Sequence, residues 1–221
     1  MKLTILGKYG PFPAAGGACS GYLVERGATR ILIDCGSGVL SRLQKICDIK
    51  DLSAVVLSHL HSDHMADMLV LRYALEIWKV RGMYNKGSIP VYLPESPPDI
   101  YNQVTSTSAF RPIAIKNGLK TTIGDISFTF REMTHPIPSY AMAMECEGKK
   151  LIYTGDTSIN PVIEEFAKDA DYLVADTGLL EKDKTEKAPH LTAEEVGKIA
   201  AGAGVKNLIL SHIWPGYAEE D

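Results

Sequence analysis

Residues 58–64 read Ser-His-Leu-His-Ser-Asp-His, which places three imidazoles and one carboxylate within six residues. They follow the apolar run 52–57 and precede an amphipathic pattern that begins near Met65. Imidazole and carboxylate groups are common ligands of first-row metal ions, and a loop that leaves a buried strand holds them on the rim of a sheet. The segment therefore predicts a metal site, while a loop of unrelated polar side chains is the alternative.

The regions on both sides of this segment contain short runs rich in β-branched and aromatic residues, bounded by Gly, Pro or Asp. They predict strands over residues 2–6, 21–25, 30–34, 54–58, 89–93, 126–131, 140–146, 150–154, 172–175 and 207–211. Helical spacing and capping signals predict helices over residues 38–46, 65–81, 161–168 and 193–203. Because strands dominate the first half and alternate with helices in the second, we expect an α+β fold with two packed mixed sheets and helices outside.

Two further expectations concern packing. The stretch 89–117 is rich in Pro, Ser and Thr and is expected to be an exposed excursion that shapes the mouth of the pocket, with Tyr92, Tyr101 and Phe110 on it. The apolar stripe of the second helix is expected to face the core. It comprises Met65, Met68, Leu69, Leu75 and Trp78.

Composition describes an ordinary domain. Of 221 residues, 45% are hydrophobic and 23% charged, so we expect a single domain over residues 1–221. A net charge of −4 argues against binding long nucleic acid or anionic membrane through bulk electrostatics. The N-terminus lacks a signal-peptide core, no apolar run reaches the ~18 residues of a membrane span, and the four cysteines form no C-x-x-C pair. These features predict a cytoplasmic protein with no membrane partner.

Three more potential ligands each follow a predicted strand. His135 lies in Met-Thr-His-Pro, Asp156 in a Thr-Gly-Asp-Thr turn, and His212 at the end of the last strand. Each by itself would also suit an ordinary turn or strand end. With the H-x-H-x-D-H segment, their order resembles that of the metallo-β-lactamase-fold hydrolases over essentially the whole chain. The resemblance implies a four-layer αβ/βα sandwich.

The resemblance also implies a dinuclear zinc centre, with manganese or iron as the alternative metals. One ion would be held by His59, His61 and His135, the second by Asp63, His64 and His212, and Asp156 would bridge both. Nitrogen and oxygen ligands without a thiolate suit two such divalent ions, which make a hydroxide available at neutral pH. Asp34, at the end of another strand, would support the metal loop or serve as an ordinary turn residue.

The sixth histidine points to a branch of this superfamily. His190 precedes a capped helix and lies downstream of Asp176, an arrangement that resembles ribonuclease Z and related phosphodiesterases. Asp176 stands where those relatives usually have Glu. By this resemblance, Asp63, His190 and Asp176 are the catalytic residues, with His190 protonating the leaving alkoxide and Asp176 orienting it. The alternative for His190 is a solvated loop histidine.

The spacing between two of these ligands limits the substrate. Ribonuclease Z usually carries an RNA-holding arm between the lone metal histidine and the bridging aspartate, yet only residues 136–155 separate His135 from Asp156. A large RNA partner is therefore not expected, and we predict attack of a metal-bridging hydroxide on a small phosphodiester. A carboxylic ester, lactone or thioester hydrolase with the same metals, and a non-catalytic metal-binding accessory protein, are the alternatives.

The C-terminus departs from the superfamily pattern. The chain ends nine residues after His212, where relatives usually continue with another helix and a short strand. We therefore expect either that a C-terminal helix and strand are missing or that the fold closes differently. The sheet edge left uncovered predicts a homodimer.

Overall fold

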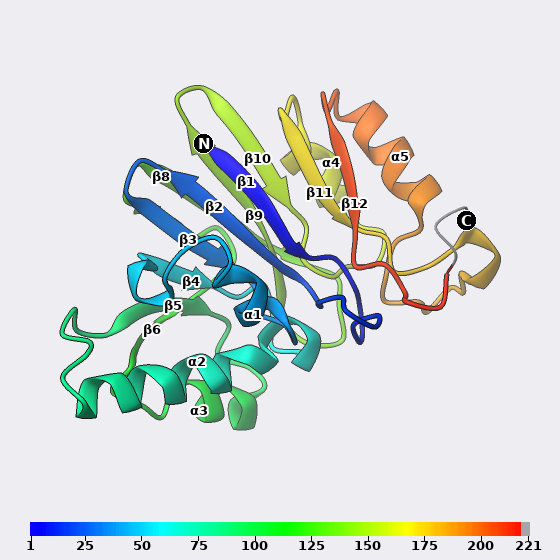
Figure 1. The fold of residues 1–221 in the computed structure, drawn as a ribbon. Coiled ribbons are helices and arrows are strands. Elements are labelled where there is room, and N and C mark those ends of the chain that lie inside the picture. The colour runs from blue at the N-terminus through cyan, green and yellow to red at the C-terminus, as the bar shows by residue number, and fades with distance from the viewer. Residues whose placement is uncertain (218–221) are drawn as a thin grey trace.

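Two six-stranded β-sheets form the centre of the computed structural model, which describes residues 1–217 (Figure 1). In spatial order, the first sheet contains β1 (Lys2–Gly7), β2 (Gly21–Arg26), β3 (Thr29–Ile33), β4 (Ala54–Val56), β5 (Ile89–Leu93) and β6 (Phe110–Ala114). The second contains β12 (Leu208–Ser211), β11 (Tyr172–Asp176), β10 (Lys149–Tyr153), β9 (Ser139–Cys146), β8 (Ile126–Met133) and β7 (Lys120–Ile123). Each sheet is mixed: β1–β3 and β7–β10 are antiparallel, whereas β3–β6 and β10–β12 are parallel.

Helices cover the outer face of each sheet (Figure 1). The first sheet carries α1 (Val39–Leu43), α2 (Ser62–Val80) and α3 (Pro98–Thr105), and the second carries α4 (Pro161–Ala167) and α5 (Ala193–Gly202). Two short 3-10 turns, η1 (Ile49–Asp51) and η2 (Glu181–Asp183), lie in the connections. The expected α+β arrangement of two packed mixed sheets with helices outside is confirmed.

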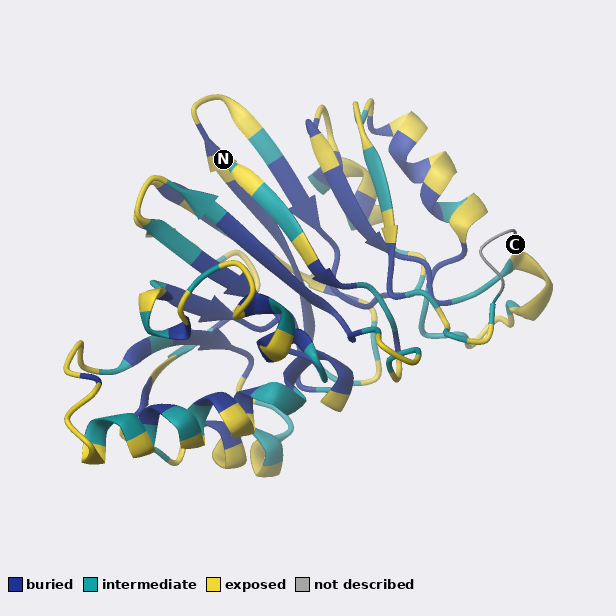
Figure 2. Ribbon diagram, in the orientation of Figure 1, coloured by how far each residue is buried: buried dark blue, intermediate teal, exposed yellow. Residues whose placement is uncertain are grey.

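Three hydrophobic clusters separate four layers, and the alternation of strand side chains creates them (Figure 2). In β3, Ile31 and Ile33 point between the sheets while Leu32 points toward the helices of the first sheet. In β9, Met142 packs between the sheets and the small Ala143 packs under the helices of the second sheet. Because successive strand side chains face opposite ways, a strand buried on both faces reads as a continuous apolar run.

The predicted excursion over residues 89–117 is wrong. Its ends form β5 and β6, which pair in parallel at one edge of the first sheet, and its middle forms α3. Tyr92 and Phe110 are buried in the core, and Tyr101 packs against it, so none of them lies on an exposed mouth. The prolines misled the prediction, because Pro112 lies on the edge strand β6, where a missing backbone N–H is tolerated.

The predicted core stripe of α2 is correct except for Leu69. Met65, Met68 and Leu75 are buried and Trp78 packs against the same cluster, whereas Leu69 is 36% exposed. At 3.6 residues per turn, Leu69 falls beyond the edge of the stripe on the solvent side.

The ends of the chain give two smaller findings. β12 is an edge strand of the second sheet, so the sheet edge expected near the C-terminus is present. The predicted departure concerns the residues after His212, of which 218–221 lie outside the described part of the chain. Over residues 1–217, no helix combines the length and the apolar character that crossing a bilayer requires.

Candidate metal centre

The loop after β4 and the first turn of α2 carry four of the predicted ligands. α2 begins at Ser62, three residues before the predicted start, so Asp63 and His64 are helical while His59 and His61 lie in the loop. His61 is the residue before the first helical position. A carboxylate in the first turn is stabilised by the helix dipole, which accounts for Asp63 at this place.

The other three ligands lie just beyond the ends of strands of the second sheet. His135 follows β8, Asp156 follows β10, and His212 follows β12. Because β10, β11 and β12 run parallel, their carboxyl ends meet at one edge of the sheet, which is where ligand sites form in such sheets. His212 has a φ of 59°, in the left-handed region that non-glycine residues rarely adopt, so this position is held against a backbone preference.

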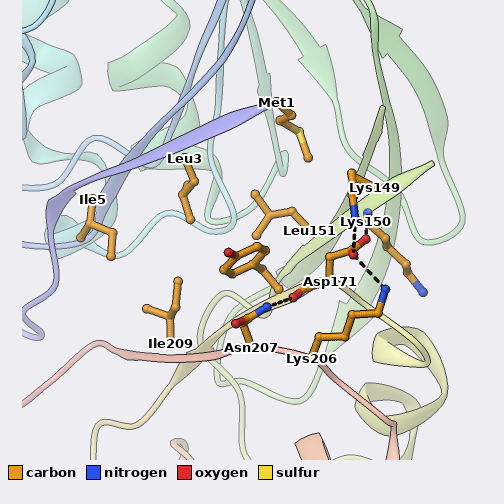
Figure 3. A pocket seen from close by; sticks show the side chains of 11 residues that line it. Met1, Leu3, Ile5, Lys149, Lys150, Leu151, Asp171, Lys206, Asn207 and Ile209 are labelled. Atoms are coloured by element: carbon orange, nitrogen blue, oxygen red, sulfur yellow. Dashed lines mark hydrogen bonds and ion pairs between the residues drawn. The ribbon is translucent and has the colours of Figure 1, made fainter. Parts of the chain in front are cut away.

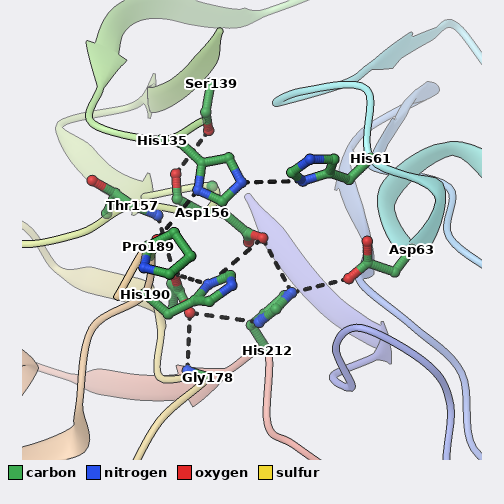
Figure 4. A network of polar contacts seen from close by, with 12 residues as sticks. His61, Asp63, His135, Ser139, Asp156, Thr157, Gly178, Pro189, His190 and His212 are labelled. Carbon is green, nitrogen blue, oxygen red and sulfur yellow. Dashed lines mark hydrogen bonds and ion pairs between the residues drawn. The ribbon is translucent and has the colours of Figure 1, made fainter. Parts of the chain in front are cut away.

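The first group of potential ligands consists of His59, His61, His135 and Asp156, of which Figure 4 shows the last three. The Nδ1 atom of His61 lies 3.1 Å from Nε2 of His59 and 3.1 Å from Nε2 of His135. His59 Nε2 lies 3.5 Å from Asp156 Oδ2. One ligand atom from each residue lies within 4.8 Å of all the others, which is compact enough for one ion.

The second group consists of Asp63, His64, His212 and the same Asp156. His212 Nε2 lies 3.0 Å from Asp63 Oδ2 and 3.2 Å from Asp156 Oδ2. His64 Nε2 lies 3.2 Å from the other Asp156 oxygen, Oδ1. Asp156 thus belongs to both groups, in the position that a bridging ligand requires.

Buried atoms without partners show that these residues fit a divalent cation. His64 Nε2 and Asp156 Oδ1 are both buried and have no hydrogen-bond partner among the described residues. Buried polar atoms are rarely left in this condition unless water or an ion satisfies them. Imidazole nitrogens and carboxylate oxygens without a thiolate are donors that suit zinc, manganese or iron.

Proton affinities in the centre are strongly shifted by burial and by charge. Burial, reinforced by the neighbouring His64, holds the pKa of His59 well below its usual range. Burial would also lower the pKa of His64, but the carboxylates of Asp156 and Asp34 outweigh it and raise that pKa well above the usual value. The pKa of His212 is raised to about 9 in the same way, chiefly by Asp156. Burial opposes ionisation of Asp156, yet the imidazoles, above all His212, lower its pKa well below normal. The carboxylates therefore attract positive charge into a buried site.

Asp34 forms a second layer of contacts behind His64. Its Oδ2 accepts hydrogen bonds from His64 Nδ1 at 2.8 Å, from the hydroxyl of Ser58 at 2.8 Å and from the hydroxyl of Tyr153 at 2.7 Å. Its Oδ1 accepts from the backbone N–H of Ser58 at 2.7 Å. Such contacts fix the ring and direct Nε2 toward the metal position. Sequence pattern had placed Asp34 near the metal loop, but the pattern contains no sign of Tyr153.

His190 and Asp176 also reach the centre. His190 Nδ1 lies 2.9 Å from Asp176 Oδ2 and 3.8 Å from Asp156 Oδ2. The His190 ring stacks on His212 with centroids 4.8 Å apart, and its side chain is 22% exposed. Asp176 is itself fixed, because it accepts hydrogen bonds from the backbone N–H groups of Thr157 and Gly178. The short carboxylate arm of Asp176 therefore reaches His190.

Two glycines allow the chain to approach the ligands closely. A Cβ at Gly10 would lie 2.0 Å from His212 Nε2, and a Cβ at Gly36 would lie 1.9 Å from the carbonyl oxygen of Asp63. Neither position has room for a side chain. All nine predicted site residues lie together, and Ser58, Tyr153 and these glycines are the additions that the structure makes.

Comparison with protein families gives one match that covers most of the chain. The family described as "Beta-lactamase superfamily domain" matches residues 29–213. Among curated proteins, this chain is 35% identical over 213 residues to the probable metallo-hydrolase YhfI of Bacillus subtilis. That alignment covers 96% of this chain and 87% of the relative.

Solved structures give the same likeness in three dimensions. The crystal structure of YhfI, a metallo-beta-lactamase fold protein of Bacillus subtilis, has a TM-score of 0.93 and 32% identity, covering 99% of this chain and 88% of that one. The short form of human tRNase Z has a TM-score of 0.80 and 21% identity, with 97% and 93% covered. A diphosphatase of the PhnP family has a TM-score of 0.78 and 19% identity, with 99% and 88% covered. At these lower identities, the last two are likenesses of fold alone.

Proposed function

Because this chain belongs to the beta-lactamase superfamily domain family and has the metallo-β-lactamase fold, we propose that it is a metal-dependent hydrolase of small phosphodiesters. The observation that carries the choice of reaction is the contact of His190 with Asp176 at 2.9 Å, beside Asp156. A ring fixed in this way presents a proton donor to the leaving group of a phosphodiester. Hydrolysis of a carboxylic ester at the same metals does not require such a donor.

Two zinc ions are the proposed cofactors, with manganese or iron as the alternatives. The first would be held by His59, His61 and His135, the second by Asp63, His64 and His212, and Asp156 would be shared. When bound, such ions supply a water-derived nucleophile near neutral pH and positive charge beside the reacting phosphoryl group.

The chain's own residues provide orientation and proton transfer. Asp176 binds Nδ1 of His190, so the opposite nitrogen, Nε2, is the atom that would donate a proton to the leaving alkoxide. Stacking on His212 fixes the plane of the same ring. Asp63 Oδ2 lies 3.0 Å from His212 Nε2, so the ring on which His190 stacks is itself held by a member of the second metal group.

The region between His135 and Asp156 favours a small substrate. Residues 136–155, all described, form the hairpin of β9 and β10 without a projecting arm. The net charge of −4 adds no electrostatic attraction for a long polyanion.

Cleavage of a dinucleoside monophosphate, whose leaving group is an alkoxide that needs a proton, by the wild type and by His190→Ala, at matched metal content, tests the proposal. We expect a loss in kcat of about 10²- to 10⁴-fold on this ester with metal content retained, since this is the range for a positioned general acid. The loss on bis(p-nitrophenyl) phosphate should be much smaller, because p-nitrophenolate leaves without a proton. Lys187→Ala is the control, because Lys187 is exposed on the same loop and outside the centre.

Other ester classes separate the proposed function from its alternatives. Rapid opening of a lactone or thioester by the metal-loaded protein, with no cleavage of any phosphodiester, would reject the proposal in favour of carboxylic ester chemistry. Inactivity toward all three ester classes would instead favour a metal-binding accessory protein.

A further inference from the structure

Phe12 and Trp214 form an aromatic pair on the surface near the metal centre. Their ring centroids lie 5.5 Å apart with an interplanar angle of 78°, an edge-to-face contact. Phe12 is 49% exposed and Trp214 is 40% exposed. Each ring therefore leaves a large part of its surface for another contact.

Backbone contacts attach this pair to the metal centre. Trp214 is the second residue after His212, and Phe12 is the second residue after Gly10, whose Cα packs against the His212 ring. The N–H of Gly10 donates to the carbonyl of Ile213 at 3.2 Å, and the N–H of Ile213 donates to the carbonyl of Lys8 at 2.8 Å. Both aromatic residues therefore lie on segments that are hydrogen-bonded to each other next to His212.

The sequence around Phe12 restricts its mobility. It lies between Pro11 and Pro13, which fix their own φ and restrict the residues that precede them. A preorganised ring loses little conformational freedom when it binds a ligand. Single exposed apolar side chains, such as Tyr73 on α2, are ordinary on protein surfaces. Phe12 and Trp214 differ because two distant segments bring them together, each within two residues of a position at the metal centre, Gly10 or His212.

We propose that Phe12 and Trp214 form the specificity wall of the substrate site and bind a planar aromatic ring carried by the phosphodiester. This inference rests on the proposed function and names the substrate class for the same site. A nucleobase and an aryl group both supply such a ring. Stacking on exposed aromatic side chains is largely independent of which ring it is, and contributes to binding outside the bond being cleaved. Loss of the wall therefore acts mainly on KM.

Three esters with the same p-nitrophenolate leaving group test the wall. The other substituent is methyl, phenyl or thymidine 5′-yl, so all three share the ring of the leaving group and only the phenyl and thymidine esters carry a second ring outside it. We expect Trp214→Ala and Phe12→Ala to lower kcat/KM for the phenyl and thymidine esters about tenfold more than for the methyl ester, through KM. Trp214→Phe should retain most of the preference. Tyr73→Ala is the control, since it removes an even more exposed aromatic ring, on α2.

Tryptophan fluorescence gives a readout independent of turnover. The chain has two tryptophans, so Trp78→Phe leaves Trp214 as the single emitter. In the metal-loaded protein, thymidine 5′-monophosphate and phenyl phosphate should quench Trp214, whereas methyl phosphate should not. Phe12→Ala should raise the concentration needed for half-quenching about tenfold.

The outcomes separate this inference from the proposed function. Equal losses on all three esters, or quenching by methyl phosphate as strong as by the ring-bearing ligands, would overturn the aromatic wall while leaving phosphodiesterase activity intact. Failure of the wild type to cleave any of the three, with ring-dependent quenching of Trp214 preserved, would instead reject the phosphodiesterase and keep the ring site. Quenching by thymidine 5′-monophosphate alone would identify the ring as a nucleobase.

Discussion

Asp156 is the residue on which both halves of the metal centre depend. Its Oδ2 lies 3.5 Å from His59 Nε2 of the first group and 3.2 Å from His212 Nε2 of the second, and its Oδ1 lies 3.2 Å from His64 Nε2. A carboxylate is the ligand type that bridges two hard or borderline ions readily. Its buried Oδ1 has no hydrogen-bond partner among the described residues, so a bound cation would satisfy this atom.

Asp34 acts on the same centre through His64. We expect Asp34→Ala to weaken metal binding about 10- to 100-fold, because it removes the acceptor that orients His64. Tyr153→Phe, which removes only one donor to Asp34, should have a smaller effect in the same direction. Competition with a chromogenic chelator measures both, and Tyr172→Phe, an exposed tyrosine, is the control. An unchanged affinity in Asp34→Ala would show that packing alone orients His64.

At the scale of elements, the N-terminus of helix α5 supports the loop that carries His190. Thr192 forms a capping box with Glu195, and it also donates to Glu181 at 2.7 Å. His190 lies only two residues before this cap, and Lys184 Nζ contacts both the His190 carbonyl and Glu195. The start of α5 therefore fixes the loop that carries His190.

Substitution of Thr192 tests how much the cap contributes to the free energy of unfolding. We expect Thr192→Ala to lower the free energy of unfolding by about 1 kcal/mol, since a buried N-cap is lost, and Thr192→Ser to retain most of it. Urea unfolding followed by circular dichroism measures the change, with Lys187→Ala as the control. A midpoint for Thr192→Ala equal to that of the wild type would mean that the cap contributes nothing here.

For the whole molecule, Asp171 connects three strands at the end of the second sheet opposite the metal centre (Figure 3). Its carboxylate accepts from the backbone N–H of Lys150 and from the ammonium groups of Lys149 and Lys206. These contacts, the backbone hydrogen bond first, lower the pKa of Asp171 below its usual value. The stability that they provide is present above the unfolded-state pKa of about 4 and is lost as pH falls through the lower folded-state value.

We therefore expect Asp171→Asn to be less stable to thermal unfolding than the wild type at neutral pH. This difference in stability between the two proteins should narrow below about pH 4. Thermal unfolding between pH 7 and pH 2.5 measures this, with the exposed Glu186→Gln as the control. A difference that stays constant across that range would exclude ionisation of Asp171 as its cause.

The open edges of the two sheets concern assembly. β1 and β12 are edge strands that flank a surface cavity of about 590 Å³ (Figure 3). Ile5 on β1 is 45% exposed and Leu210 on β12 is 40% exposed. The homodimer stays a prediction. Light scattering at micromolar concentration should show twice the monomer mass for the wild type, and Leu210→Asp should reduce the measured mass. A wild-type monomer under these conditions would contradict it.

The sequence by itself determined the periodic elements and the chemical identity of the site. Strand alternation and the capping box of α5 are local patterns, because backbone geometry sets them over a few residues. That is why ten of the twelve strands could be named in advance, whereas the nine site residues, which the structure brings together, were named through the resemblance to a known family. The local pattern failed at β6, which Pro112 interrupts, and at the short polar strand β7, where sheet pairing overrode propensity.

Only the tertiary structure decided which of these residues meet. The sharing of Asp156 between two groups, the reach of Asp176 to His190 and the contact of Tyr153 with Asp34 join segments far apart in sequence. The pairing of Phe12 with Trp214 belongs to the same class. Such contacts depend on sheet order and on the packing of one layer against another, which no short window of sequence contains, because they are fixed by burial across the whole fold.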